Sequence, residues 1–270
     1  MAIITISRGT FSGGQGLAQC VAERLGYRCL ARVVAHEAAL RYGVSEEKLS
    51  KAMEEPPGIL ERLRTERERA RYLACARATL VREVKNDNVV YHGLAEHFLL
   101  EGVPHVLRVR VIANIEFRIK GAMERTGLER KEAIEYIKKA DEKRVRWARF
   151  LYQADWYDPS LYDLVINLDH ISLDSACEIV CHCVSLDEFA RAPEWQKIMD
   201  DLVLSTEVRA IVAANKGIAD SGLEVEADGG VITLGGTVGS LQDEDKIREI
   251  AAAAPGVKDI NSKMQVKPTW

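Results

Sequence analysis

The fold of this chain is decided near its start, in the stretch Ile3-Ile4-Thr5-Ile6-Ser7-Arg8-Gly9-Thr10-Phe11-Ser12-Gly13-Gly14-Gln15-Gly16-Leu17. Its first residues are apolar and β-branched, as in a buried strand, and Leu17, Val21 and Leu25 recur at helical spacing. Between these segments, residues 9–16 include four glycines. Glycine lets the backbone approach an anion closely, and a helix N-terminus offers its N–H groups to that anion. The stretch therefore predicts a phosphate-binding loop between a strand and a helix.

Two groups of a complete catalytic phosphate loop are missing here. Such a loop carries Lys after its last glycine, to reach the β- and γ-phosphates, and then Ser or Thr to hold Mg²⁺. Gln15 stands at the lysine position, and Gly16 and Leu17 bring no hydroxyl group. Arg8, just before the loop, is our candidate for the missing positive charge. A tight strand–helix turn that binds no ligand is the alternative interpretation.

Composition indicates a globular chain long enough for two domains. The 270 residues include 37 Lys and Arg and 41 Asp and Glu, which gives a net charge of −4, and 47% of them are hydrophobic. Residues 196–270 hold 8 basic and 12 acidic residues and so carry the whole of this charge. Because the chain lacks the basic footprint of a nucleic-acid-binding protein, we expect no nucleic-acid partner.

The same sequence predicts a cytoplasmic protein with no transmembrane segment. No stretch reaches the roughly 18 apolar residues of a membrane span, and the first residues lack the basic region and cleavage site of a signal peptide. We expect the six cysteines to be reduced thiols. Three of them lie close together with a histidine, but no second ligand pair follows at zinc-like spacing. We therefore expect no metal site at Cys177, Cys181, His182 and Cys183.

Strand-like and helix-like segments alternate over the first 185 residues or so, and this pattern predicts an α/β fold with a parallel sheet. The strand candidates are residues 2–7, 88–91, 105–112 and 162–168. The character changes after Pro193. Two strand-like segments, 223–226 and 231–234, are joined there at Asp228-Gly229-Gly230, a hairpin signal. We expect domains at residues 1–187 and 201–267, with a linker at 188–200 and a small α+β fold for the second domain.

Residues 1–187 resemble the cytidylate kinase-like branch of the P-loop nucleoside monophosphate kinases. The resemblance rests on Ile6-Ser7-Arg8 leading into Ser12-Gly13-Gly14, on residues 89–93, on residues 106–112 followed by Ala113 and Arg118, on Asp141-Glu142-Lys143-Arg144, and on residues 158–167. It implies a three-layer P-loop fold with a lid, ATP as the phosphoryl donor, and CMP or a similar acceptor. The donor-binding residues would be Gly9, Ser12, Gly13, Gly14, Gln15, Gly16 and Leu17. The catalytic residues would be Arg8, Gln15 and Arg144.

Several family positions are altered, which leaves a second interpretation open. Besides Gln15, the family's Asp-Arg pair appears as Ala31-Arg32 and its Gly-Arg pair as Gly93-Leu94. A catalytically inactive nucleotide sensor or scaffold is therefore the alternative, and the need for Mg²⁺ stays open. The family's monophosphate-binding segment coincides with an arginine cluster that alternates with glutamates, so a solvated helix with local ion pairs is the interpretation we favour there. That cluster consists of Arg62, Arg64, Arg67, Arg69 and Arg71.

Residues 201–267 resemble a BON domain. The matching features are Ser205-Thr206-Glu207-Val208-Arg209, residues 225–234, Gly236-Thr237-Val238 and residues 254–260. The resemblance implies contact with a small ligand, a phospholipid or a protein. Because this region is acidic, it lacks the polybasic attraction that draws proteins to anionic lipid.

Overall fold

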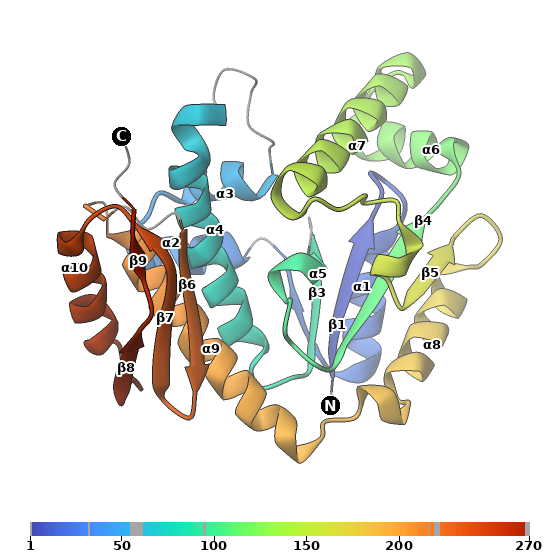
Figure 1. The fold of residues 1–270 in the computed structure, drawn as a ribbon. Helices are drawn as coiled ribbons and strands as arrows, with labels where there is room; N and C mark the ends of the chain where they lie inside the picture. The colour runs from blue at the N-terminus through green and yellow to red at the C-terminus, as the bar shows by residue number, and fades with distance from the viewer. Residues whose placement is uncertain are drawn as a thin grey trace.

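Five parallel strands form the central sheet of the N-terminal part, as the alternation of segments predicts (Figure 1). A computed structural model of the chain describes residues 2–31, 33–54, 62–93, 96–215, 217–218 and 222–267. The strand order is β2-β3-β1-β4-β5, so the strand that leads into the glycine loop lies in the middle. The strands are β1 (Ile3–Arg8), β2 (Arg28–Leu30), β3 (Val89–Gly93), β4 (Val106–Ile112) and β5 (Leu164–Asn167).

Helices cover both faces of this sheet and make the expected three-layer α/β architecture. Side chains alternate between the faces of a strand, so Ile4 and Ile6 pack with α1 (Gly14–Leu25) and α8 (Leu173–Val184). Ile3 and Tyr91 belong to the core on the other face. Helices α2 (Val33–Tyr42), α3 (Glu46–Glu54), α4 (Arg62–Val84) and α5 (Glu96–Leu99) also contribute residues to that core.

Two helices, α6 (Ile115–Thr126) and α7 (Arg130–Tyr152), project beyond the carboxyl ends of the strands (Figure 1). We refer to them as the lid helices. They share a small core of their own, formed by Ile119, Ala122, Ala133 and Ile137, and Phe11 of the glycine loop packs against it. Phe11 has a φ of 58°, a left-handed conformation that is rare for a bulky side chain. The loop is thus attached to the lid by an apolar side chain as well as by polar contacts.

The C-terminal part folds around its own core and contains the expected hairpin. β6 (Gly222–Asp228) pairs antiparallel with β7 (Val231–Val238), and both turn residues, Gly229 and Gly230, have positive φ. β8 (Asp259–Ser262) and β9 (Gln265–Val266) each pair parallel with β7. The core of this part includes Ile232 and Leu234 of the sheet and Ile247 of α10 (Leu241–Ala252).

One helix, α9 (Pro193–Ala214), belongs to both parts of the molecule. It runs without a break through residues 193–200, which the sequence assigns to a linker, and only the short turn η2 (Asp187–Phe189) precedes it. Proline suits the first turn of a helix because its φ is preset and its missing N–H is not needed there. Met199 and Ala210 lie in the N-terminal core, whereas Val208 and Val212 lie in the C-terminal one. Among the described helices, none is long and apolar enough to cross a membrane.

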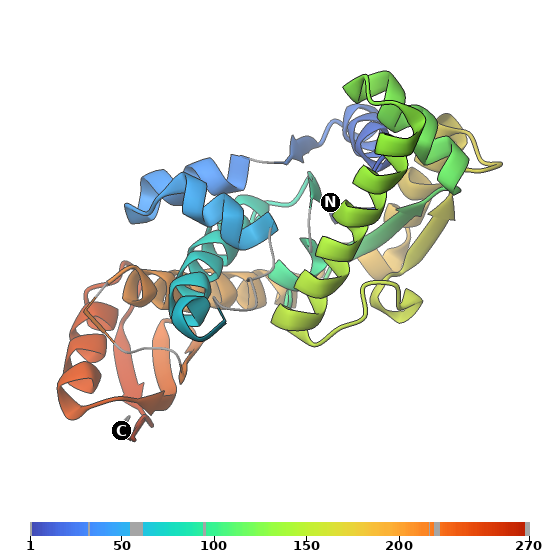
Figure 2. The same cartoon turned by 90° about the horizontal axis from the view of Figure 1, so that it is seen from above.

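A buried carboxylate fastens α9 to the N-terminal part. Glu207 accepts hydrogen bonds from Arg41 Nη2 at 3.1 Å, from Arg82 Nη2 at 2.8 Å and from the Tyr42 hydroxyl at 2.9 Å. Burial works to raise the pKa of Glu207, but the bonds from Arg82, Arg41 and Tyr42 outweigh it and hold this pKa below its usual range. Seen from above, the C-terminal part lies at the opposite end of the molecule from the lid helices (Figure 2).

Candidate functional site

The glycine loop has the backbone of an anion-binding turn. β1 ends at Arg8, α1 begins at Gly14, and the residue between loop and helix, Gly13, has a left-handed φ of 88°. No side chain caps the N-terminus of α1. The first-turn N–H groups of a helix have no partner inside the helix, and they carry the positive end of its dipole. An anion at this point would therefore find amides to which no side chain in the described part of the chain is bonded.

Two loop glycines are required, Gly14 by the space around it and Gly13 by its left-handed φ of 88°. A Cβ atom on Gly14 would lie 2.6 Å from the Cβ of Arg8, and one on Gly13 would lie 2.7 Å from the Cδ1 of Leu168. Ser12 braces the loop from inside, with its hydroxyl 3.0 Å from the carbonyl oxygen of Gly9 and 3.1 Å from that of Val111. A larger residue at Gly13 or Gly14 would therefore disturb the conformation of the loop.

The remaining predicted site residues occupy different positions relative to the loop. Gln15 and Gly16 lie in the first turn of α1, and the Gln15 side chain is exposed. Leu17 is fully buried in the core between α1 and the sheet, and its N–H donates to the Gly13 carbonyl. Leu17 therefore anchors the helix and presents no polar side-chain atom to a ligand. Arg8 lies against Gly14 at the end of β1.

His92 lies beside this arrangement at the end of β3, paired in register with Ile6. Its side chain is 6% exposed. Burial, together with the nearby positive charge of Arg8, lowers the pKa of His92 to about 4. The imidazole is therefore neutral at neutral pH.

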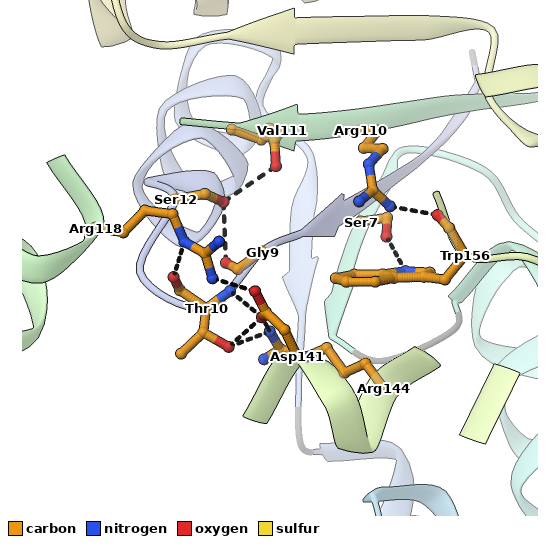
Figure 3. A network of polar contacts seen from close by, with 10 residues as sticks. All are labelled: Ser7, Gly9, Thr10, Ser12, Arg110, Val111, Arg118, Asp141, Arg144 and Trp156. Carbon is orange, nitrogen blue, oxygen red and sulfur yellow. Dashed lines mark hydrogen bonds and ion pairs between the residues drawn. The ribbon is translucent and has the colours of Figure 1, made fainter. Parts of the chain in front are cut away.

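The lid reaches the loop through Asp141 of α7 (Figure 3). Its Oδ1 atom accepts from the backbone N–H of Thr10 at 3.2 Å and from the Thr10 hydroxyl at 2.8 Å. Arg118 of α6 donates to Asp141 Oδ2 at 2.5 Å and to the Thr10 carbonyl at 2.8 Å. Arg144 donates to the Thr10 hydroxyl at 2.5 Å and to Asp141 Oδ1 at 3.2 Å. The Asp141 carboxylate thus accepts from a backbone N–H of the loop and from the guanidinium groups of Arg118 and Arg144.

This network combines one residue that the sequence predicts with three that it does not. Arg144 is brought to the loop, as the resemblance implies. Asp141 and Arg118 appear in the sequence only as parts of matching segments, and Thr10 is not singled out. The available signal is the spacing of Asp141 and Arg144, which places them on one face of a helix. The arrangement can hold an anion, because amides and guanidinium groups converge on one point.

The arginine cluster at the start of α4 is described only in part. The side chains of Arg62, Arg64 and Arg67 lie outside the described residues. Arg69 is buried and its Nη2 donates to the carbonyl of Lys51 at 3.4 Å. The six cysteines are all free thiols.

The model of one protein family matches most of the N-terminal part. It is described as the cytidylate kinase-like family, and it matches residues 3–170. The chain belongs to the cytidylate kinase-like family. The model of the BON domain matches residues 200–268, so the C-terminal part is a BON domain.

Curated relatives agree with this family, and a solved structure shares the fold of the N-terminal part. A cytidylate kinase of Methanopyrus kandleri is 28% identical over 188 residues, which cover 66% of this chain and 90% of that protein. A cytidylate kinase of Archaeoglobus fulgidus is 29% identical over 190 residues, which cover 68% of this chain and 94% of that protein. The crystal structure of an uncharacterized protein from Eubacterium ventriosum covers 68% of this chain and 98% of its own at a TM-score of 0.50. Its identity to this chain is 19%, so it bears on the fold alone.

Proposed function

We propose that this chain binds ATP with its phosphates in the glycine loop and transfers the γ-phosphoryl group to CMP or a similar nucleotide. In this reaction an acceptor phosphate oxygen bonds to the γ-phosphorus, the bond from that phosphorus to the bridging oxygen breaks, and ADP leaves. Catalysis of phosphoryl transfer consists mostly of positioning and charge neutralisation. A cytoplasmic location, where ATP is abundant, is part of this proposal.

The observation that carries the proposal is the convergence of amides and cations at one point. The uncapped N-terminus of α1 lies between Arg8 on one side and the lid arginines, Arg118 and Arg144, on the other. In our proposal the donor phosphates bind the backbone of Gly9, Ser12, Gly13, Gly14, Gln15 and Gly16. The family to which the chain belongs, and relatives that carry the name cytidylate kinase, support this assignment.

Asp141 must leave the loop when a phosphate arrives. Its carboxylate and the phosphate compete for the same Thr10 N–H and the same two guanidinium groups. Two anions cannot share this small site without strong repulsion. We therefore expect nucleotide binding to move α7 away from its present contact with the loop.

A second candidate function follows from Gln15. A glutamine donates a hydrogen bond but brings no charge, and no hydroxyl follows it to hold Mg²⁺. Nucleotide binding without transfer would make the domain a sensor or scaffold, and the BON domain would then mediate contact with a small ligand, lipid or protein. The continuous helix α9 and the buried Glu207 favour this alternative, because they connect the two domains directly.

One assay separates the two candidates. The full chain is incubated with ATP and CMP, with Mg²⁺ or with EDTA, and CDP is quantified by ion-exchange chromatography. We expect slow CDP formation, and faster formation by Gln15→Lys. The matched control is Gln19→Lys, which places the same charge on an exposed position of the same helix. ATP binding without CDP formation would favour the sensor. The absence of both ATP binding and CDP formation would contradict both candidates.

A further inference from the structure

Three of the six cysteines come together where α1 packs against α8. Cys177 of α8 is fully buried in the core that these helices share, and Cys20 of α1 and Cys181 of α8 lie partly buried beside it. All three are free thiols. Neither the glycine loop nor the lid uses them, so this thiol cluster, Cys20, Cys177 and Cys181, calls for an explanation of its own.

The packing of the two helices places Cys20 level with Cys177. Both helices follow parallel strands of one sheet, so they run in the same direction. A Cβ atom on Gly16 would lie 3.4 Å from the Cδ2 of Leu173, which brings these two positions into contact. Residues four positions apart share a face of a helix, and one turn further along this contact lie Cys20 and Cys177. The Cys177 thiol is accordingly within hydrogen-bonding reach of the Cys20 thiol, and the Cys181 thiol within reach of Cys177.

The surroundings give the two facing thiols different roles. Burial, and then the hydrogen bond to Cys20, hold the pKa of the Cys177 thiol well above its usual range, although the guanidinium group of Arg24 works to lower it. Arg24 lies one turn after Cys20 and reaches across to α8, where its Nη2 is 2.5 Å from Asp174 Oδ1. Cys177 therefore keeps its proton as an S–H donor. Cys20 is the partly exposed member of the pair, so it is the thiol that a reagent from solvent meets first.

Two other cysteines lie away from the thiol cluster and provide a comparison. Cys29 is exposed on β2, at the opposite edge of the sheet from β5, and Cys75 is buried in the core on the other face. Within the described part of the chain, no group of three or more His, Cys, Asp or Glu side chains could hold a metal ion. The chemistry open to neighbouring thiols is then oxidation to a disulfide.

We propose that Cys20 and Cys177 form a reversible disulfide when the chain meets a hydroperoxide. The Cys20 thiolate attacks one peroxide oxygen, the O–O bond breaks, and Cys20 becomes a sulfenic acid while the other oxygen leaves as water or an alcohol. The Cys177 sulfur then attacks the Cys20 sulfur, the S–O bond breaks, and the second oxygen leaves as water. The two thiols lose two electrons, which reduce the peroxide, and their two protons leave on the two oxygens. A dithiol reverses the step by thiol–disulfide exchange.

This disulfide would join α8 to the helix that begins at the glycine loop. Because it connects residues far apart in the chain, it would restrict the unfolded state strongly and raise the melting temperature by several degrees. Neither thiol belongs to the glycine loop or the lid, so the oxidation is independent of the proposed function and requires no nucleotide.

Treatment of the folded full chain with one equivalent of hydrogen peroxide, followed by peptide mapping without reduction, tests this proposal. Digestion with a glutamate-specific protease is suitable, because cleavage after Glu178 separates Cys177 from Cys181 and Cys183. We expect the chain to lose two hydrogen atoms in mass and to yield a peptide pair joined through Cys20 and Cys177. Dithiothreitol should restore the starting mass, and the oxidised chain should melt several degrees higher than the reduced one.

Two variants assign the roles of the thiols. In Cys177→Ser we expect no joined peptides and a sulfenic acid on Cys20 that dimedone traps. Cys29→Ser is the matched control, since it removes an exposed thiol outside the cluster and should leave the disulfide unchanged. The peptide map of the wild type needs no variant, so the test stays decisive if Cys177→Ser does not fold. A Cys20 that stays reduced, forms no disulfide, or pairs with Cys181 or Cys183 would overturn the proposal.

Discussion

Asp141 of the lid helix α7 places its carboxylate on the backbone N–H of Thr10 in the glycine loop, with Oδ1 3.2 Å from the amide nitrogen. Phosphate-binding loops offer such amides to anions. The protein therefore supplies an internal anion to its own loop. Arg118 and Arg144 share this one carboxylate, so Asp141 also occupies both guanidinium groups of the lid.

Removing this internal anion should strengthen nucleotide binding. Asp141→Asn leaves an oxygen for the Thr10 amide but frees Arg118 and Arg144 to bind phosphate, so we expect ATP to bind about tenfold more tightly. The ligand-free protein should lose about 1–2 kcal/mol of stability, because two half-buried cations lose their partner. Calorimetric titration measures the first effect and thermal unfolding the second. Glu135→Gln, an exposed position on the same helix, is the control. Unchanged ATP affinity in Asp141→Asn would show that the contact does not compete with nucleotide.

A methyl group in the loop should damage the site. Gly14→Ala brings a Cβ to 2.6 Å from the Cβ of Arg8, so either Arg8 or the helix start must move. We expect a loss of about 1–3 kcal/mol in stability and no measurable nucleotide binding. Gly16→Ala is the matched control, since its Cβ would meet only Leu173, at an ordinary 3.4 Å. Equal behaviour of the two variants in urea unfolding and in titration would contradict this account of the loop.

The Glu207 carboxylate between the two domains should make the protein less stable at acid pH. The pKa of Glu207 is lowered in the folded protein, so its contribution is present above the unfolded pKa of about 4.3 and is lost as the pH falls through the folded value. Glu207→Gln should lower stability by about 2 kcal/mol at pH 7 and flatten the acid limb. Thermal unfolding between pH 3 and pH 7 measures both effects. Glu226→Gln, on an exposed position of β6, should leave the pH profile unchanged. An acid limb of the same slope in Glu207→Gln would argue against the interdomain role.

His92 should produce a separate pH dependence at milder acidity. Its pKa is about 4 when folded, because of burial and the charge of Arg8, against about 6.5 when unfolded. Below pH 6.5 the unfolded chain therefore binds a proton at His92 that the folded protein does not bind. The free energy of unfolding then falls by up to about 3 kcal/mol as the pH drops from 6.5 to 4. His92→Gln should remove this slope. Urea unfolding at several pH values checks the prediction, and exposed His170→Gln serves as the control. A slope that persists in His92→Gln would assign it to other groups.

Much of the fold could be predicted from local patterns. The β-branched segment at residues 3–6 with glycines behind it predicts the central strand and the helix start, and Asp228-Gly229-Gly230 predicts the hairpin between β6 and β7. These features depend on neighbouring residues, so one sequence is enough to recognise them. The start of α9 was not predicted. Pro193 reads as a break when it follows a helix, but it also suits the first turn of a new one.

The site was less predictable because its partners are far apart in the chain. Asp141 meets Thr10 from 131 positions away, and Arg110 meets Trp156 from 46 positions away. Nothing local in the sequence distinguishes these charged residues from those on solvated helix faces. Leu17 shows that the side chain of a residue next to the loop can lie entirely in the core.

The most direct test of the central claim is thermal unfolding of the full chain with ATP and with adenosine. A ligand at 100 times its Kd adds about 2.7 kcal/mol to the folded state, which raises the melting temperature by several degrees. We predict this rise with ATP, a much smaller one with adenosine, and none for Gly14→Ala with either. No rise with ATP at millimolar concentration, or an equal rise in Gly14→Ala, would contradict a nucleotide site at the glycine loop.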